Sequence, residues 1–317
     1  RVHKLALEVG YQRNPALGAL MAQIRKRSHT GSMGTLALFN AHQDPDAFRT
    51  HATIPNYVEG CSRRARAMGF AVNNFWSFTP ETSPQRWIQI LQSRGILGII
   101  LIGMMKQNRV PEHLRPVVEA FPTVVTGVRT RDPALSFASV DHHILALRAF
   151  ERAIELGYER PGLVLDGEID DLVDHRFSAG FATGQLHLPP AQRLRPFFEV
   201  GAAREEPRLF KDWLEAEKPD VIFTLYNSVA EWLEGLGQKV PEDIGLIQLE
   251  WRPNRPHWAG MNQHNDVVGE AAVDLLLRMV HHGELGAPPY PRATLIGLGV
   301  LVVVYGVVFS FGIYYMN

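Results

Sequence analysis

The feature of this sequence that most limits its fold is a regular alternation of strand-length and helix-length segments. Short apolar runs typical of strands occupy residues 34–40, 71–75, 98–102, 123–125, 160–165, 221–224 and 244–249. Segments with helical spacing lie between or after them, at residues 57–68, 84–94, 144–156, 206–217, 227–236 and 266–280. Strands that alternate with helices in this way predict parallel sheets joined by right-handed crossovers.

Two local patterns support this interpretation. The run 98–102 is apolar throughout, as expected of a parallel strand covered on both faces. Glycine follows several predicted helices, at Gly69, Gly95, Gly157 and Gly237, where it favours a helix C-cap. No internal repeat or low-complexity linker is present, so we expect the connection between domains to be more complex than one simple linker.

Length and composition limit the class of protein. The 317 residues are enough for two domains with buried cores, and the formal net charge is −1 at pH 7. Any nucleic-acid contact must therefore depend on a local basic patch. Cys61 is the only cysteine, which excludes an intrachain disulfide and a thiolate metal cluster and fits a reducing compartment.

The usual signs of catalysis are missing from the sequence. The histidine pairs His142-His143 and His281-His282 are adjacent residues, whose side chains point to different sides of an element. No HExxH, G-x-S-x-G, GxGxxG or P-loop motif occurs. We therefore predict no catalytic residues, no metal and no cofactor; the remaining enzymatic hypothesis is a hydrolase cleft in a binding-protein-like fold, with no residues to assign to it.

The segment 11–35 reads as a junction between a helical unit and the α/β body. Asn14 can cap a helix, and Pro15 suits its first turn. A short apolar helix from Ala16 ends in the basic run Arg25, Lys26 and Arg27, where positive charge suits the helix dipole. Such a helix could lie in a DNA groove or against a second copy of the chain, or it could be an ordinary surface helix.

This junction resembles the hinge of LacI-type transcription regulators. The resemblance is carried by Glu8-Val9-Gly10-Tyr11, Asn14-Pro15-Ala16 and Leu20, whereas Gly18 departs from the arginine common in the family. It implies that DNA is contacted by Arg13, Asn14, Pro15, Ala16, Leu20, Arg25, Lys26 and Arg27, with Leu20 as a minor-groove wedge. Because the sequence begins within a helix, we expect most of the helix-turn-helix to be missing.

The resemblance extends through the body of the chain. Ile154-Glu155-Leu156-Gly157-Tyr158 is similar to a family helix end, and Arg176-Phe177-Ser178-Ala179-Gly180-Phe181 is similar to its R..GF segment. Pro219-Asp220-Val221-Ile222-Phe223 and Val240-Pro241-Glu242-Asp243-Ile244 match two further strings. Together the matches cover residues 1 to about 297.

The resemblance implies two doubly wound parallel-sheet lobes, like those of periplasmic binding proteins, with a ligand cleft between them. The expected divisions are residues 1–31 for the DNA-binding remnant and hinge, 32–297 for the two-lobed effector-binding and dimerisation domain, and 298–317 for a tail. Within the body, one lobe is expected at about 32–140 with part of the C-terminal region, and the other at 141–260. The implied function is a cytoplasmic, homodimeric, ligand-responsive regulator that acts as a repressor and binds operator DNA and a sugar-like effector. The alternative is a solute-binding protein without a DNA role.

Ligands of open α/β sheets bind beyond the carboxyl ends of the strands. Adding Arg176, which matches an arginine that in the family commonly reaches the ligand, gives the candidate ligand-binding residues Asn40, His42, Asn74, Phe75, Trp76, Met104, Arg176, Tyr226, Asn227, Glu250 and Trp251.

Several candidates have an ordinary structural alternative. Arg176 could pair with Asp174 or Glu168, Glu250 could pair with Arg252 or Arg255, and the aromatic residues could be core. Tyr226-Asn227 replaces the family's usual Asn-Asp, and Glu250 replaces an Asp. These departures indicate a ligand larger than a simple hexose, or differently polar.

The end of the chain fits none of these patterns. Residues 293–317 carry no charge and are long enough to cross a hydrocarbon core of ~30 Å. The alternatives are a membrane-like tail of accidental or foreign origin and a buried terminal strand pair; a purposeful membrane anchor is the least favoured.

Overall fold

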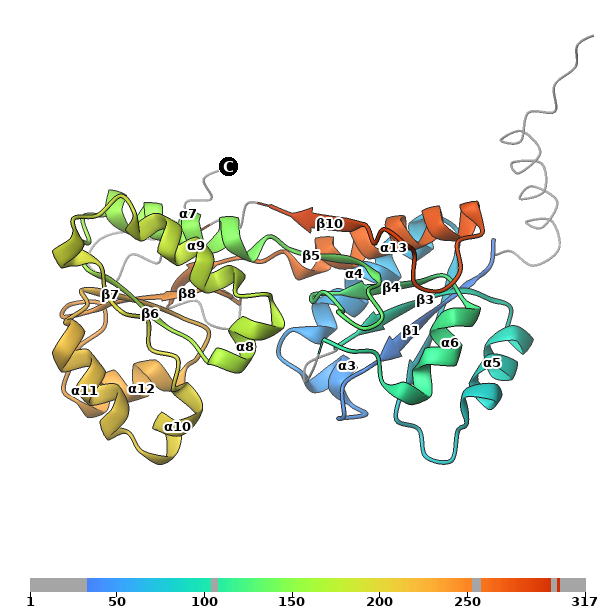
Figure 1. Cartoon of the computed structure of the whole chain (residues 1–317), viewed down its shortest axis with the longest axis horizontal. Helices are drawn as coiled ribbons and strands as arrows, with labels where there is room; N and C mark the ends of the chain where they lie inside the picture. Colours follow the sequence, from blue (N-terminus) through green and yellow to red (C-terminus); the bar gives the residue numbers. More distant parts are fainter. Residues whose placement is uncertain (1–32, 104–107, 253–257, 298–300, 303–317) are drawn as a thin grey trace, which may run out of the picture.

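The computed structural model describes residues 33–103, 108–252, 258–297 and 301–302, and within these ranges the chain forms two α/β lobes placed side by side (Figure 1). The first lobe contains a six-stranded sheet in the order β10-β5-β4-β3-β1-β2, and the second a five-stranded sheet in the order β11-β9-β8-β7-β6. The predicted fold class of two parallel-sheet, binding-protein-like lobes is confirmed.

In the first lobe every strand pairing is parallel. Its strands are β1 (Thr35–Asn40), β2 (Ala71–Trp76), β3 (Ile96–Ile102), β4 (Thr123–Thr126), β5 (Ser136–Val140) and β10 (Ala293–Ile296). Its helices are α3 (Ala47–Thr50), α4 (Ile54–Ala67), α5 (Pro84–Ser93), α6 (Arg115–Ala120) and α13 (Asn265–His282).

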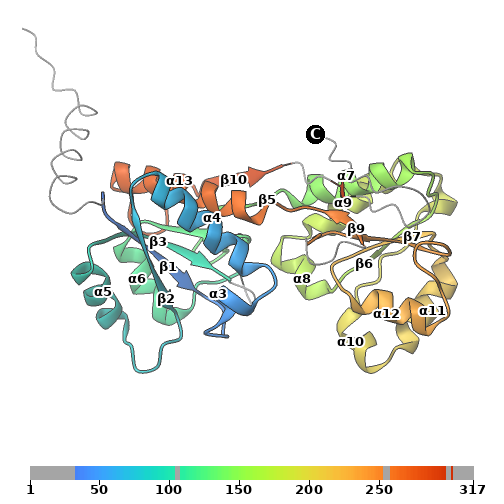
Figure 2. The ribbon, with the colours of Figure 1, turned by 180° about the vertical axis from the view of Figure 1, so that it is seen from behind.

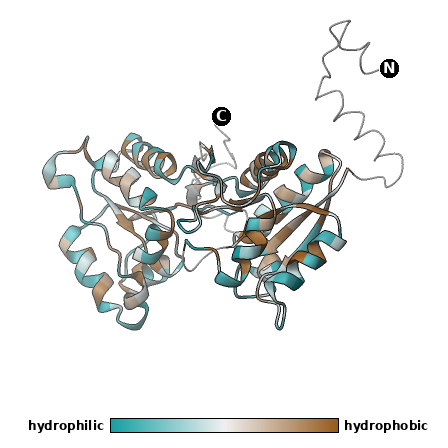
Figure 3. Ribbon diagram, turned by 45° about the vertical axis from the view of Figure 1, so that its right-hand side comes forward, coloured by the Kyte–Doolittle hydropathy of each residue, from teal (hydrophilic) through white to brown (hydrophobic). Residues whose placement is uncertain are grey.

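The two faces of this sheet are covered by different helices. Leu36, Leu38 and Ile100 pack towards α4 and α13, whereas Phe39 and Leu101 pack towards α5 and α6. Alternation along a strand therefore supplies two cores, as expected for a sheet buried on both sides. Figure 3 shows the same pattern, with brown strands inside and teal surfaces on the helices.

The second lobe repeats this arrangement. Its strands are β6 (Pro161–Val164), β7 (Val221–Thr224), β8 (Gly245–Gln248), β9 (Ala259–Met261) and β11 (Leu301–Val302). Its helices are α7 (His142–Glu155), α8 (Gly167–Leu172), α9 (Arg176–Gln185), α10 (Val200–Glu205), α11 (Arg208–Glu217) and α12 (Ser228–Gly235). The aromatic rings of Phe150, Phe181 and Phe223 join α7 and α9 to the sheet.

The chain passes between the lobes more than once. It enters the second lobe between β5 and α7 and returns to the first between β9 and α13. The two sheets also receive consecutive strands, β10 in the first lobe (Figure 2) and β11 in the second. This agrees with the expectation that the lobes are not joined by one simple linker.

The helices α4 and α13 cross so closely that glycine is required at the contact. A Cβ atom on Gly60 would lie 1.8 Å from the carbonyl oxygen of Asp266, and one on Gly269 would lie 2.3 Å from that of Tyr57. Arg63 bridges the same helices by pairing with Asp266 and Glu270. This crossing fixes the start of α4, which faces the second lobe.

The C-terminal tail is described only at Leu301–Val302, which pair antiparallel with β9. The hinge and basic segment predicted at residues 11–31 and most of the predicted tail lie outside the described residues. Among the residues that are described, no helix has the length and apolar character needed to cross a membrane.

Candidate functional site

A cavity of about 280 Å³ lies between the two lobes. The first lobe contributes the start of α4 and the residues that end or follow β3 and β4, including Gly103 and Thr126. The second contributes α8, the start of α9 and the residues after β7 and β8. The carboxyl ends of the strands thus meet at the cavity, as the rule for open α/β sheets expects.

An ion pair stands at one side of this cavity. Glu250 and Arg252, which follow β8, are 2.6 Å apart, and their side chains are 13% and 18% exposed. The second carboxylate oxygen of Glu250 accepts a hydrogen bond from Asn265 at 3.1 Å, and Arg252 donates to the hydroxyl of Thr53 at 3.0 Å. This group, which we call the inner bridge, joins the second lobe to the start of α4.

The inner bridge separates the large cavity from a smaller polar one of about 160 Å³. Both cavities share Glu250, Arg252 and Gln263 in their linings. Asn56, Glu59 and Asp266 line only the smaller one. The apolar and the polar space are therefore held apart by a charge pair that makes hydrogen bonds to Asn265 and Thr53.

The histidine and tyrosine side chains of the large cavity are neutral near pH 7. Burial, with a smaller contribution from Arg176, lowers the pKa of His142 to about 3. Burial and His42 lower the pKa of His51. Burial raises the pKa of the Tyr57 and Tyr226 hydroxyls, with Glu250 adding to the rise at Tyr57 and Asp166 at Tyr226. These shifts follow from desolvation, which disfavours the charged form.

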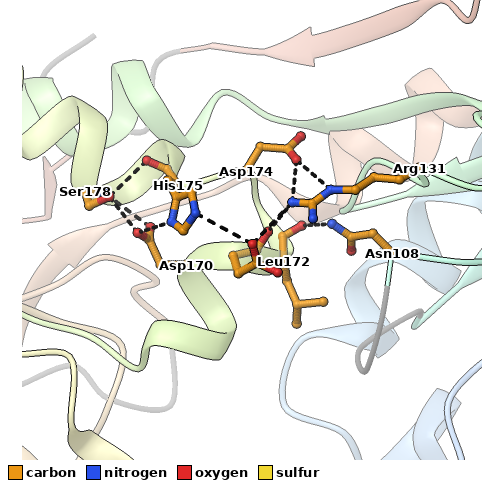
Figure 4. Close-up of polar contacts among 8 residues, drawn as sticks. Asn108, Arg131, Asp170, Leu172, Asp174, His175 and Ser178 are labelled. Atoms are coloured by element: carbon orange, nitrogen blue, oxygen red, sulfur yellow. Dashed lines mark hydrogen bonds and ion pairs between the residues drawn. The ribbon is translucent and has the colours of Figure 1, made fainter.

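A second set of contacts joins the lobes at the edge of the cavity (Figure 4). Arg131 of the first lobe pairs with Asp174 at 2.9 Å and Asp171 at 3.4 Å. Asn108 donates a hydrogen bond to the carbonyl oxygen of Leu172 at 2.8 Å. We call the contacts of Arg131 the outer bridge.

The partners of the outer bridge are held in place by the buried Asp170. Its carboxylate accepts hydrogen bonds from the Ser178 hydroxyl at 2.6 Å and the Ser178 amide at 3.2 Å, and it lies 3.2 Å from a ring nitrogen of His175. Asp174 and His175 have φ values of 55° and 56°, which non-glycine residues seldom adopt. This tight turn links α8 to α9 and presents Asp174 to Arg131 (Figure 4).

Some of the predicted ligand-binding residues lie at these cavities. Tyr226 and Glu250 line the large cavity, and Trp251 lines the polar one. Arg176 lines a small neighbouring space with His142, at the same junction between lobes. Its predicted alternative partner, Asp174, pairs with Arg131 and, at 3.9 Å, with Arg129.

Other predicted residues lie away from the large cavity. Asn40 is buried and uses its amide to bond the carbonyls of Asp44 and Pro45. Asn74, Phe75 and Trp76 belong to β2, which is the edge strand of the first sheet. Phe75 stacks on Phe39 in the core, and Trp76 donates to the carbonyl of His42, whose own ring lies 5.4 Å from that of His51.

The remaining predicted residues have other placements. The side-chain oxygen of Asn227 is buried without a hydrogen-bond partner, directly before α12. Met104 and the DNA-contact residues Arg13, Asn14, Pro15, Ala16, Leu20, Arg25, Lys26 and Arg27 lie outside the described residues. Over the described ranges, no group of three or more His, Cys, Asp and Glu residues is placed to hold a metal ion.

Sequence reasoning missed several residues of the large cavity. His51, Tyr57 and Phe177 line it without having been singled out as ligand contacts. Phe177 directly follows the predicted Arg176 in the first turn of α9. Extending the prediction from Arg176 along this first helical turn could have indicated Phe177 as a lining residue. Arg252 was considered only as a partner of Glu250, and that alternative is confirmed by the ion pair.

Comparison with known proteins supports the same fold. Residues 150–296 match the family of periplasmic binding protein-like domains. No curated protein is significantly similar in sequence. The structure is similar to a LacI-family regulatory protein from Chloroflexus aggregans, with a TM-score of 0.64, 16% identity, and coverage of 85% of this chain and 96% of that one.

The chain has the fold of LacI-type regulators. Two further structures agree with this. The transcriptional regulator CelR in complex with cellobiose has a TM-score of 0.63 and 17% identity, with 92% of this chain and 91% of that one covered. CcpA of Lactococcus lactis has a TM-score of 0.57 and 16% identity, with 83% and 96% covered. The resemblance to LacI-type regulators that the sequence motifs indicated is thus confirmed at the level of the fold.

Proposed function

We propose that this protein is a ligand-responsive transcription regulator, acting as a repressor, whose effector binds between the lobes. The observation that carries the proposal is the cavity of about 280 Å³ lined by both lobes. A ligand that contacts both lobes binds one relative orientation of them more tightly than another. It therefore shifts the equilibrium between orientations. The LacI-type fold supports coupling of that shift to DNA through the segment 11–31.

The expected effector class is a sugar or a related metabolite. In its support, one structurally similar regulator, CelR, is described as a complex with cellobiose. The regulator is further proposed to act as a homodimer, because two-fold symmetry matches a palindromic operator. Light scattering at micromolar concentration tests the dimer, and a monomer would count against it.

The experiment that tests the function joins residues 33–317 to the helix-turn-helix and hinge of a LacI-type regulator whose operator is known. Operator binding is followed by fluorescence anisotropy while a panel of sugars and apolar metabolites is added. We expect at least one compound to change the operator affinity by tenfold or more.

Two variants make this experiment specific to the cavity. Ile169 lines the cavity from α8 and is half-buried, whereas the neighbouring Glu168 is exposed. Ile169→Trp should fill the cavity and abolish the response, and Glu168→Trp should retain it. Ligand binding without any effect on operator affinity would favour a solute-binding protein instead.

A further inference from the structure

The lining of the large cavity is mainly apolar. Ile54 and Val128 face it from the first lobe, and Ile169, Val173, Phe177 and Leu225 face it from the second. Apolar walls on both sides favour a ligand that buries hydrocarbon surface. At roughly 30 Å³ per water molecule, a cavity of about 280 Å³ has the volume of about nine waters, which suits a compound of one or two rings.

The charges at the cavity cancel. Glu250 and Arg252 neutralise each other at 2.6 Å, and their remaining contacts are to the uncharged Asn265 and Thr53. His142 and His51 have lowered pKa values and are neutral near pH 7. A charged ligand would therefore lose its hydration without gaining a counter-charge, which is costly.

Several polar groups of the lining already make one hydrogen bond within the protein. Gln263 donates to the carbonyl of Leu249 at 2.9 Å, and Thr126 donates to that of Leu101 at 3.4 Å. The Tyr226 hydroxyl accepts from the Asp166 amide at 3.3 Å. A sugar, with a hydroxyl on nearly every carbon, would have to leave many of these hydroxyls without partners.

Two neutral polar side chains of the lining, one from each lobe, are free of hydrogen bonds to the described residues. Within the described ranges, the Tyr57 hydroxyl of the first lobe and the His142 imidazole of the second make no hydrogen bond to the protein, and both residues line the cavity. The His142 ring also packs against Phe177, with ring centroids 4.6 Å apart. A ligand ring that lies near Phe177 would bring a substituent towards these two groups.

From this arrangement we propose that the effector is an uncharged, largely apolar ring compound with one or two hydrogen-bonding groups, which face Tyr57 and His142. The proposal rests on the proposed function, since it names the ligand class of the same cavity. It narrows the expectation of a sugar or related metabolite to compounds that carry few hydroxyls.

The test uses the full chain and the uncharged fluorescent probe N-phenyl-1-naphthylamine. Probe fluorescence is titrated with the unmodified protein, Ile169→Trp and Glu168→Trp, after circular dichroism has established that each is folded. We expect the unmodified protein and Glu168→Trp to bind the probe equally, and Ile169→Trp to bind at least tenfold more weakly. Equal binding by Ile169→Trp would place the probe outside the cavity and overturn the proposal.

Calorimetry on the unmodified protein then measures three compounds that share a methoxyphenyl ring and carry a neutral, an anionic or a cationic head group. These are 4-methoxybenzyl alcohol, 4-methoxybenzoate and 4-methoxybenzylamine, with glucose and cellobiose alongside. The alcohol should bind at least tenfold more tightly than either ion or either sugar. If a sugar binds and the alcohol does not, the ligand class is wrong while the proposed function stands. If ligands bind but none changes operator affinity in the fusion protein, the function fails and the ligand class stands.

Discussion

The inner and outer bridges both contain an ion pair and both connect the two lobes, the inner one through its hydrogen bonds to Asn265 and Thr53, but they differ in their contact with water. The side chains of Glu250 and Arg252 in the inner bridge are 13% and 18% exposed, whereas those of Arg131 and Asp171 in the outer bridge are 49% and 55% exposed. Exposed ion pairs contribute little to stability, while a buried charge left alone is strongly destabilising. The inner bridge should therefore maintain the site, and the outer bridge should adjust the balance between lobe orientations.

The largest effect is expected when the inner bridge is broken from one side. Glu250→Gln leaves the charge of Arg252 without its carboxylate partner, which should lower the free energy of unfolding by about 3 kcal/mol. Urea denaturation monitored by tryptophan fluorescence measures this. The double variant Glu250→Gln/Arg252→Met removes both charges and should recover most of the loss. A single variant as stable as the unmodified protein would contradict the comparison.

The next effect concerns pH and the buried His142. Its pKa is lowered to about 3 from an ordinary 6.5, so between these values the unfolded chain binds a proton that the folded chain does not. Stability is therefore complete above pH ~6.5 and declines as the pH falls towards 3. At pH 4.5, about two pKa units below the ordinary value, the loss is roughly 2–3 kcal/mol.

His142→Gln measures this contribution directly. The unmodified protein should lose more stability than the variant between pH 7 and pH 4.5, whereas the exposed His282→Gln should follow the unmodified protein. Parallel pH profiles for His142→Gln and the unmodified protein would show that His142 is not the group responsible. Because His142 lines the large cavity, the same comparison tests whether that side of the cavity is as shielded from water as the inner bridge.

The fold was largely predictable because apolar periodicity reports burial. The run at 221–224 coincides with β7, and the run at 98–102 lies within β3. Gly69, Gly95, Gly157 and Gly237 all adopt the positive φ expected after a helix. The strand β5, Ser136–Val140, was missed because its buried serines interrupt the apolar pattern. Short elements such as α8 and β9 give too few residues for a periodic signal.

The site was less predictable because a strand end does not reveal which strand faces the partner lobe. Asn74, Phe75 and Trp76 follow the strand-end rule, but β2 is the edge strand of its sheet. Tyr226 and Glu250 follow the same rule on β7 and β8, next to the junction, and line the cavity. Strand order depends on contacts that are distant in sequence. His51 lies just before α4 and Tyr57 lies within it, so both reach the cavity through the crossing of α4 with α13.

A smaller effect is expected for the neutral contact between the lobes. Asn108 is buried and donates to the carbonyl of Leu172, so Asn108→Ala should lower the free energy of unfolding by about 1 kcal/mol. Because no charge is removed, the loss should be the same at low and high salt in urea denaturation. A loss that shrinks with salt would mean that Asn108 acts through the neighbouring charges of the outer bridge.

The smallest effect on stability is expected for the outer bridge itself. Arg131→Ala should lower the free energy of unfolding by less than about 1 kcal/mol, and the loss should fade at high salt because screening weakens exposed pairs. Arg148→Ala, which breaks the exposed pair with Glu151 within α7, is the matched control. Small-angle X-ray scattering should show a wider distribution of lobe separations for Arg131→Ala only, since the Arg148–Glu151 pair lies within α7 and does not connect the two lobes. The contrary result is that Arg131→Ala lowers the free energy of unfolding as much as Glu250→Gln does, independently of salt. In that case the exposure of the side chains does not distinguish the two bridges, and both hold the lobes together.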